Sequence, residues 1–342
     1  MPCRVCNNDS VHVHQKTWSL PYGTDLKETD PQKILYCRIL TGPYKNKMMK
    51  ELITTLERRS DLENLLRTET DTIMVSVDGL SSTVAEKLSR EELSQIVDRI
   101  RTAGKKIAVR ANMTLHEGML EKADALMAHL GTLDIHAIFF ADPALLSIAR
   151  KHQLVGRMIY DPETLMTSIN DANWWLDRGI EGVSVSPLLT LQETDEISSA
   201  VHKAIVTVHG RTLMSRSYRQ LLSAYQEANQ LTETLRGSRH LYLIESKRGE
   251  GRMPVYEDET GTLIYSDNVL DSFDFIRDVL QSDPMGLLIE GSYITLEEQM
   301  DAIHAYRRIL DGEDPSVIGK EYRAKFSNEP LDSGYYEQKT VR

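Results

Sequence analysis

Residues 72–112, which read TIMVSVDGLSSTVAEKLSREELSQIVDRIRTAGKKIAVRAN, decide the fold of this chain. The two ends of this stretch, Thr72–Val77 and Lys106–Asn112, are short runs rich in apolar and β-branched residues, as buried strands are. Between them, Ser89–Gly104 carries apolar residues at i, i+3 and i+4 and ends in a glycine, which is typical of a helix. Strand, helix and strand in this order predict a parallel βαβ unit.

The same alternation repeats along most of the chain. Eight strand-like runs are present: Glu51–Glu57, Thr72–Val77, Lys106–Asn112, Ala137–Asp142, Gly156–Asp161, Gly182–Pro187, Ala204–Gly210 and Gly286–Gly291. The first seven begin about 25 residues apart on average, which suits one strand, one helix and their loops. We therefore predict an α/β fold, a (β/α)8 TIM-type barrel over residues 49–292.

The connection between the seventh and eighth runs is too long for a helix alone, because about 75 residues separate Gly210 from Gly286. We predict an α+β insertion over residues 211–285. Its expected parts are a helix from Leu213 to about Leu235, a strand at His240–Ser246, and a hairpin of Met253–Glu257 and Thr262–Ser266. Residues 293–342 are expected to hold one amphipathic helix, Leu296–Leu310, and then a polar tail from Asp311.

Residues 1–48 differ from the rest of the chain. They carry 7 Lys+Arg and 4 Asp+Glu, whereas residues 49–342 carry 33 and 47, and they lack a sustained helical or alternating pattern. All three cysteines, Cys3, Cys6 and Cys37, lie here. We expect a disordered extension, or a start codon placed too far upstream, with Met48 or Met49 as the true start. The pair Cys3 and Cys6 with His12 and His14 permits a zinc site, but the usual longer spacer is missing.

Charge and hydropathy exclude several classes of protein. With 40 Lys+Arg against 51 Asp+Glu, the net charge of −11 argues against broad nonspecific adhesion to nucleic acid or anionic lipid, though not against a local basic patch. No run approaches the ~18 apolar residues of a membrane span, and the N-terminus lacks a secretory signal. We expect a cytoplasmic protein with no membrane partner.

Polar residues stand at the C-terminal ends of the predicted strands, where barrels place their sites. They are Asp78, Asn112, Asp142, Asp161, Ser186, His209, Glu245 and Glu290, with Glu245 supplied by the insertion. We assign His209 and Glu290 as candidate catalytic acid–base residues, and Asn112, Asp161 and Glu245 as pocket residues. Asp142 and Asp161 each precede a proline, so helix capping is the alternative for both.

Basic residues gather in the first half of the insertion. Candidate anion-binding residues are Arg211, Arg216, Arg219, Lys247 and Arg248. If residues 213–235 are helical, Arg216 and Arg219 share one face near the helix N-terminus, which favours anions. Nucleic-acid phosphates or a small carboxylate would fit such a set, and a solvated charge run is the alternative. Motifs for zinc proteases, P-loops, α/β-hydrolases and dinucleotide binding are missing, and we predict no metal site.

Several blocks carry a resemblance to a known family. They are VHGRTLMSRSYRQLLSAY (Val208–Tyr225), YLIESKR (Tyr242–Arg248), PVYEDETG (Pro254–Gly261), LIEG (Leu288–Gly291), AYR (Ala305–Arg307) and DSGYY (Asp332–Tyr336). The chain resembles the collagenase-like peptidases of family U32 over residues 49–340, and in particular the shorter of two paired members that support 5-hydroxyuridine formation at the wobble position of tRNA. The resemblance implies a barrel, tRNA as a partner, and prephenate as a small-molecule ligand held by the basic residues and oriented by His209 and Glu290.

Many members of the family hold a [4Fe–4S] cluster on four cysteines, and here the chain departs from the pattern. Leu213, Gln220 and Asp271 stand where the family has cysteines, and no cysteine follows Cys37. We therefore expect no cluster on this chain and a cluster-bearing paralogue as partner in the tRNA hydroxylation. Two alternatives stay open: a non-catalytic scaffold for that paralogue, and a peptidase as the family label says.

Overall fold

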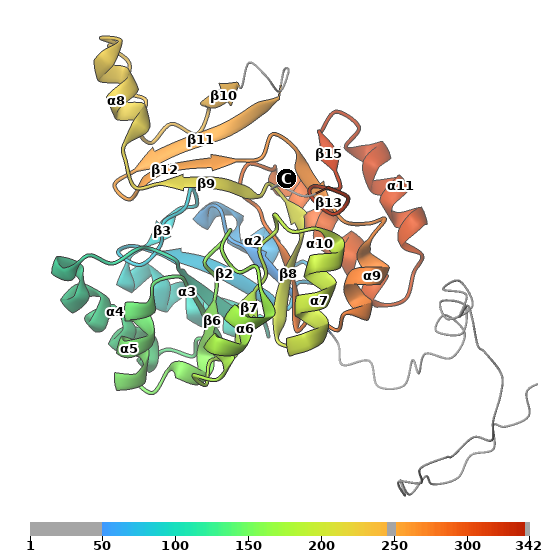
Figure 1. Cartoon of the computed structure of the whole chain (residues 1–342), viewed down its shortest axis with the longest axis horizontal. Coiled ribbons are helices and arrows are strands. Elements are labelled where there is room, and N and C mark those ends of the chain that lie inside the picture. Colours follow the sequence, from blue (N-terminus) through green and yellow to red (C-terminus); the bar gives the residue numbers. More distant parts are fainter. Residues whose placement is uncertain (1–49, 245–250, 339–342) are drawn as a thin grey trace, which may run out of the picture. The chain divides into compact units, whose positions relative to one another are not determined.

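The computed structural model describes residues 50–244 and 251–338. Eight parallel strands close into a barrel (Figure 1): β1 (Glu51–Thr55), β2 (Thr72–Val77), β4 (Lys106–Ala111), β5 (Ala137–Phe140), β6 (Met158–Tyr160), β7 (Gly182–Ser184), β8 (Ala204–Gly210) and β14 (Gly286–Ile289). The last strand closes the barrel because it pairs with β1 through Ile53 and Leu288, and with β8 through Val206 and Leu287. The predicted barrel and all eight of its strands are confirmed.

Helices follow the strands and cover the outside of the barrel (Figure 1). They are α2 (Leu62–Leu65), α3 (Arg90–Thr102), α4 (Leu120–Thr132), α5 (Pro143–Lys151), α6 (Ile169–Leu176), α7 (Leu191–Val201), α9 (Ile276–Gln281) and α10 (Leu296–Leu310). Ser89 begins α3 with a capping box, in which its hydroxyl accepts from the Glu92 amide and the Glu92 carboxylate accepts from the Ser89 amide. The short strand β3 (Lys87–Leu88) pairs with β2.

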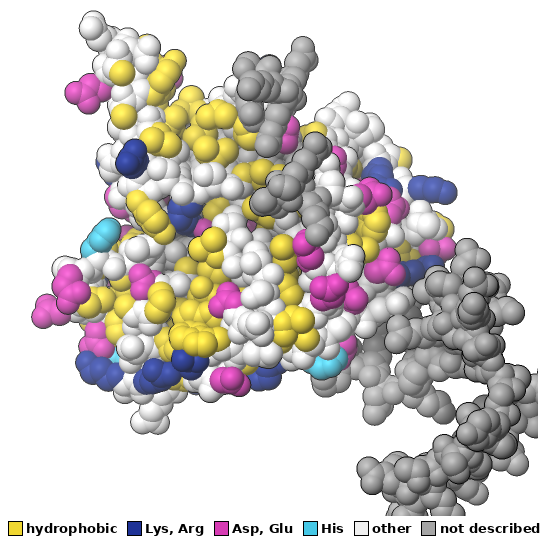
Figure 2. Space-filling model, viewed as in Figure 1, with side chains coloured by type: hydrophobic (Ala, Val, Ile, Leu, Met, Phe, Trp, Pro, Cys, Tyr) yellow, Lys and Arg dark blue, Asp and Glu magenta, His cyan; other side chains and the backbone are white. Residues whose placement is uncertain are grey.

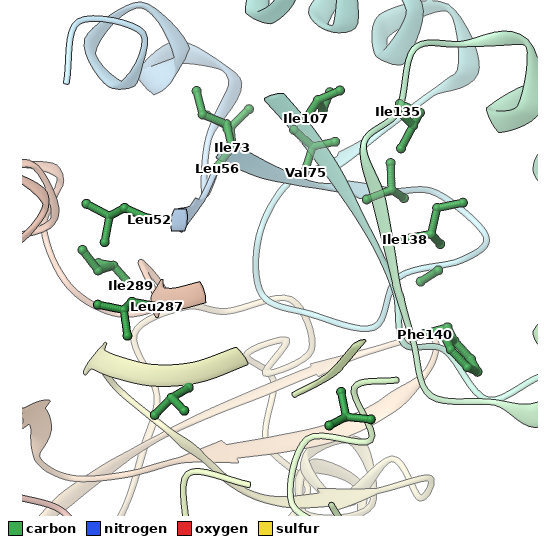
Figure 3. Packing of buried hydrophobic residues seen from close by; sticks show 14 of the residues in the cluster. Leu52, Leu56, Ile73, Val75, Ile107, Ile135, Ile138, Phe140, Leu287 and Ile289 are labelled. Carbon is green, nitrogen blue, oxygen red and sulfur yellow. The ribbon is translucent and has the colours of Figure 1, made fainter. Parts of the chain in front are cut away.

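The alternation of side chains along each strand produces two apolar layers. Seven of the barrel strands fill the interior with one residue each, except for β5, which supplies two: Ile53, Met74, Ala108, Ala137, Phe139, Ile159, Ile205 and Leu288. The larger outer layer lies between strands and helices, and Figure 3 shows part of it, including Leu52, Leu287 and Ile289 from the neighbouring strands β1 and β14. The filled interior makes the barrel a packed core, so any site must lie at an end of the strands.

The insertion forms a second sheet of its own. Its antiparallel order is β10 (Tyr242–Ile244), β11 (Arg252–Asp258), β12 (Gly261–Tyr265) and β9 (Leu213–Ser217), and α8 (Leu221–Ala228) projects from it (Figure 1). The predicted hairpin is confirmed as β11 and β12. The predicted helix from Leu213 to about Leu235 is present only over Leu221–Ala228; Leu213–Ser217 pairs with β12 as a strand, and residues 229–235 are not helical. Backbone pairing with a distant strand overrides the local helical spacing there.

The C-terminal region holds more structure than a polar tail. Helix α11 (Pro315–Lys325) begins after Asp314, whose carboxylate accepts from the Ser316 amide, and it packs beside α10. Strand β13 (Val269–Asp271) extends the barrel sheet antiparallel to β8, and β15 (Leu331–Asp332) pairs with β13. The prediction of an unpatterned tail from Asp311 is therefore wrong. Across the described ranges, no helix is long and apolar enough to cross a membrane.

Candidate functional site

The carboxyl ends of the barrel strands lie beneath the insertion sheet. Leu263 and Tyr265 of β12 pack against Val84, which follows β2 in the chain, and thereby hold the sheet over this end. We call this end of the barrel the mouth. It contains a cavity of about 60 Å³ lined by Ser82, Thr83, Arg110, Asp161, Glu163, Ser184, Pro187, Thr207, Arg211, Thr212, Leu213, Tyr265, Leu288 and Glu290.

A buried ion pair lies at the centre of the mouth. Arg110 Nη2 donates to Glu290 Oε2 at 2.6 Å, and Glu290 Oε1 also accepts from the hydroxyls of Thr55 at 3.2 Å and Ser292 at 3.0 Å. Burial acts against ionisation of Glu290, but the Arg110 charge and these hydrogen bonds outweigh it and hold the pKa of Glu290 below its usual range. Glu290 is therefore a carboxylate at neutral pH. Glu290 lines the cavity of the mouth.

A second carboxyl group, Glu57, lies beside Glu290 at the end of the neighbouring strand β1. Glu57 Oε1 accepts from the Thr55 hydroxyl at 2.9 Å, and Glu57 Oε2 accepts from the Ser292 hydroxyl at 3.4 Å. Burial, reinforced by the nearby Glu290 charge, raises the pKa of Glu57 to about 7. Thr55 and Ser292 thus contact both carboxyl groups. A carboxyl group that titrates near neutral pH, next to one that stays ionised, can give or take a proton.

Asp161 is a third acidic group in the mouth. Its residue is 7% exposed, and burial raises its pKa to about 6 against the opposing Arg110 charge. The alternative that Asp161 caps a helix is wrong, since α6 begins after Ser168, whose hydroxyl accepts from the Asp171 amide. Asp142 does cap α5 by accepting from the Ala144 amide at 2.8 Å. Asp161 is therefore a pocket residue by position.

Arg216 fastens the insertion to the rim of the mouth. Its Nε donates to Glu163 Oε2 at 2.8 Å, its Nη2 also contacts the same carboxylate, and Nη2 donates to the Ser82 carbonyl at 3.2 Å. Asn112 completes the network, because its Nδ2 donates to Glu163 Oε1 at 2.6 Å. Glu163 has a φ of +60°, a strained conformation for a residue with a side chain. Arg216 lies in β9 and not on a helix face, and its charge is already paired.

Arg211 is buried in the mouth without a carboxylate partner in the described part of the chain. Its Nη1 donates to the Ser266 carbonyl at 2.9 Å and its Nε to the Tyr293 carbonyl at 3.2 Å. Burial lowers the pKa of Arg211, which records the unfavourable environment of the charge. A buried guanidinium that contacts only neutral acceptors is suited to an anionic ligand.

His209 does not share the mouth with Glu290. Its ring is fully buried and lies outside the barrel wall against Phe273, Tyr306 and Tyr322. Nε2 is 3.0 Å from the Tyr322 hydroxyl, whereas Nδ1 has no hydrogen-bond partner among the described residues. Burial lowers the pKa of His209 to about 3, so the ring is neutral. In this position the ring of His209 does not face the mouth, so it cannot orient a ligand there as we expected.

The remaining predicted site residues separate into two groups. Arg219 is exposed just after β9, close to the rim. Glu245, Lys247 and Arg248 lie outside the described residues. No group of His, Cys, Asp and Glu side chains in the described ranges is arranged to hold a metal ion.

Sequence reasoning missed Arg110, Glu57 and Glu163. Arg110 could have been found from the sequence, because it is a charged residue inside the apolar run KIAVRAN. Alternation along the strand places it on the interior face with Ala108. Glu57 closes the first predicted strand in the same way that Glu290 follows the last. Glu163 lies in a loop, and its approach to Arg216 depends on the insertion, which no local pattern reveals.

A second and larger hollow, of about 630 Å³, lies at the opposite end of the barrel. Some of its charged groups are paired, since Glu51 lies 3.5 Å from Lys106 Nζ and 3.4 Å from His136 Nε2, whereas Lys105 Nζ and Arg157 Nη1 donate to backbone carbonyls. Although burial opposes it, hydrogen bonds from His136 and Thr72 lower the pKa of Glu51 to about 2. This hollow lies at the amino ends of the strands, and barrels place their sites at the carboxyl ends, so we place the candidate site at the mouth.

The residues present do not fit the [4Fe–4S] cluster that the resemblance to the family implies for many of its members. Leu213 lines the mouth, Gln220 immediately precedes α8, and Asp271 is bound by Arg323 Nε at 2.6 Å. Iron–sulfur clusters are held by thiolates, and none of these three side chains supplies one. The described residues contain no cysteine at all.

The chain is similar to several known proteins. The sequence profile of peptidase family U32 matches residues 57–341. The tRNA hydroxylation protein P2 of Bacillus subtilis (strain 168) is 24% identical over 308 residues, covering 85% of this chain and 98% of that protein. The tRNA hydroxylation protein P of Escherichia coli (strain K12) is 28% identical over 189 residues, covering 52% of this chain and 39% of that protein. The solved structure of the U32 peptidase Mk0906 aligns with a TM-score of 0.46 at 14% identity, covering 74% of this chain and 97% of that one.

Proposed function

Because the chain belongs to peptidase family U32, we propose that it acts in tRNA hydroxylation, the process that appears in the names of two of its relatives. The observation that carries the proposal is the match to tRNA hydroxylation protein P2, which extends over nearly the whole length of that protein. The finer proposal is that the modified nucleoside is the wobble uridine and that the product is 5-hydroxyuridine.

The mouth supports this proposal by its chemistry. It brings together a fixed carboxylate, Glu290, a carboxyl group with a pKa near neutrality, Glu57, and a buried cation that forms no ion pair within the described residues, Arg211. The first two suit proton transfer at a reacting base, and the third suits the carboxylate of a small ligand. We propose Glu290, Glu57 and Arg211 as the working residues of the site.

Hydroxylation replaces a C5–H bond of uridine by C5–OH, which is an oxidation that side chains alone do not supply. With water as the source of the oxygen atom, the step releases two protons and two electrons. We propose that a cluster-bearing paralogue takes up the two electrons and passes them to an external electron acceptor, and that prephenate is a bound anionic ligand. The cavity of about 60 Å³ is far below the roughly 300–1,000 Å³ of ligand pockets. Prephenate would not fit this cavity as it stands. We propose that β9 moves away from the rim to admit such a ligand, which requires the ion pair between Arg216 and Glu163 to open.

Nucleoside mass spectrometry of tRNA from a strain that lacks the gene tests the proposed function. We expect the level of 5-hydroxyuridine to fall, and to be restored by the unaltered gene on a plasmid. The strain keeps the cluster-bearing paralogue proposed as partner but has to lack any other enzyme that performs the same modification, because redundancy would hide the loss. An unchanged level in that doubly deleted strain would count against the function.

A scaffold for the paralogue is the second candidate, and the small size of the cavity favours it. The two candidates differ in what the mouth must do. A scaffold would restore 5-hydroxyuridine with Glu290→Gln or Arg211→Met in the mouth, provided that the paralogue still co-purifies with it. If the protein works through the mouth, each of these two variants would bind the paralogue and yet fail to restore 5-hydroxyuridine.

A further inference from the structure

Tyr218 is an exposed aromatic ring held at the rim of the mouth. It follows β9 directly, and its side chain is 62% exposed. Its phenolic oxygen lies 2.7 Å from the Thr114 hydroxyl, which belongs to the loop after β4. The ring is therefore attached at one end to the insertion and at the other to the barrel rim, while its surface stays open to solvent.

Two arginines, Arg216 and Arg219, lie close to the exposed ring of Tyr218 in the sequence. Arg216, two residues earlier in the chain, contacts Glu163 and Ser82, which line the cavity. Tyr218 lies just beyond the end of β9 and is close enough to Arg216 to affect its charge, so Tyr218 lies beside the cavity without lining it. Arg219 is exposed and forms no ion pair within residues 50–244 and 251–338.

Charge along this segment is opposite in sign to that of the whole chain. Residues 211–252 contain eight Arg and Lys against four Glu, a net charge of +4 in a protein of net charge −11. In Figure 2, dark-blue side chains lie at the end of the insertion sheet where α8 begins, above α4. Two of these cations, Arg211 and Arg216, are largely buried in the mouth, so the exposed charge next to Tyr218 in the described chain is that of Arg219. An exposed aromatic ring beside an exposed arginine complements a polyanion that carries flat, unstacked groups.

We propose that Tyr218 is a stacking platform for an unpaired RNA base at the entrance to the mouth, with Arg219 contacting a neighbouring phosphate. The inference rests on the proposed function, because tRNA supplies the anionic partner, and it adds which part of that RNA is recognised. A base in a duplex is stacked on its neighbours and presents no free face, whereas loop bases splay out onto aromatic side chains. An enzyme that modifies a base must also take it out of its stack.

Fluorescence anisotropy with the full chain tests the proposal. The probe is a labelled anticodon stem–loop with a uridine at the wobble position, and a fully paired RNA duplex of equal length is the comparison. We expect the unaltered protein to prefer the stem–loop. Tyr218→Ala is expected to raise the Kd for the stem–loop by between about fivefold and about a hundredfold, the range for loss of one base-stacking aromatic residue. Tyr218→Phe retains the ring and is expected to stay within about twofold.

Tyr225→Ala is the matched control. Tyr225 is an equally exposed tyrosine, at 58%, in the same insertion, but it lies on α8, which projects away from the barrel (Figure 1). Its removal is expected to leave the Kd unchanged. Equal Kd values for the unaltered protein and Tyr218→Ala would overturn the proposal. The exposed ring of Tyr218 would then be assigned to contact with a protein partner. Equal binding of the duplex and the stem–loop would overturn it as well.

The two proposals fail in different ways. If the stem–loop binds and Tyr218→Ala has no effect, the stacking inference is wrong while the role in tRNA hydroxylation stands. If deletion of the gene leaves 5-hydroxyuridine unchanged although Tyr218→Ala weakens the stem–loop, the proposed function is wrong and the RNA-binding surface stands.

Discussion

Arg110 Nη2 and Glu290 Oε2 lie 2.6 Å apart, and the two side chains are only 9% and 12% exposed. Arg110 belongs to β4 and Glu290 follows β14, which are three strands apart around the barrel. The pair therefore joins separate parts of the mouth, and Thr55 and Ser292 link it to Glu57 by hydrogen bonds. The charge state of the mouth depends on this pair, because Arg110 is the cation that keeps Glu290 ionised.

Removal of the cation should destabilise the fold. We expect Arg110→Met to lower the free energy of unfolding by about 3–5 kcal/mol, since it leaves the Glu290 carboxylate buried and unpaired. Urea unfolding followed by circular dichroism measures the change. Arg99→Met is the control, because Arg99 pairs with Glu63 on the surface, with both side chains about half exposed, and such pairs contribute about 0–1 kcal/mol. Equal losses in the two variants would contradict the account.

Glu57 should make stability depend on pH. Its pKa is raised from 4.5 to about 7 in the folded protein, so the folded state binds its proton more tightly than the unfolded state does. This contribution is fully present below pH 4.5 and is lost as the pH rises to about 7. The side chain of Glu57→Gln stays neutral at every pH, so this variant is expected to show a smaller change in the free energy of unfolding between pH 4.5 and about 7. Glu63→Gln, at an exposed carboxylate, is the control. A full slope in Glu57→Gln would show that the proton is held elsewhere.

The barrel could be predicted because each strand carries its own buried pattern. Runs such as TIMVSV and KIAVRA are short, mostly apolar and buried on both faces, and α3 between them begins at a capping box formed by residues close in sequence, Ser89 and Glu92. The segment Leu213–Ser217 has no such local cue, since its strand exists only by pairing with β12, some 45 residues later. Long-range pairing is what the sequence pattern could not reveal there.

The site shows the same limit at His209. Alternation from Ile205 and Thr207 would turn His209 into the mouth, but the register between β14 and β8 shifts between Leu288 and Ile289. Such a β-bulge turns the side chains that follow it to the other face. Glu290 follows the unbulged strand and faces the mouth as predicted.

Tyr322→Phe should destabilise the outer layer and spare the mouth. The Tyr322 hydroxyl is 3.0 Å from His209 Nε2 and donates to the Glu298 carbonyl at 3.1 Å. Its removal leaves both ring nitrogens of a buried histidine without partners, which costs about 1–3 kcal/mol. Thermal and urea unfolding report this loss, and Tyr225→Phe, on an exposed helix, serves as control. A large loss of stem–loop binding in a folded Tyr322→Phe protein would mean that His209 acts on the mouth after all.

Arg216→Ala should loosen the insertion. Arg216 binds Glu163 and Ser82 on the rim, so its removal leaves β9 attached to the rest mainly through β12. Hydrogen exchange followed by mass spectrometry is expected to quicken in β9 and β12 and to stay unchanged in β4 and β5. Arg219→Ala changes a neighbouring exposed charge and is expected to leave all four strands unaffected. Unchanged exchange in β9 of Arg216→Ala would show that apolar packing alone closes the mouth.

The central claim is that this chain supports tRNA hydroxylation through its mouth, and complementation tests it most directly. The deletion strain receives the unaltered gene, the Glu290→Gln gene, or the control Trp174→Ala, an exposed residue of α6, and its tRNA is analysed for 5-hydroxyuridine by mass spectrometry. At matched protein levels, we predict that the unaltered and Trp174→Ala genes restore the nucleoside and that Glu290→Gln does not. Full restoration by Glu290→Gln would contradict the account.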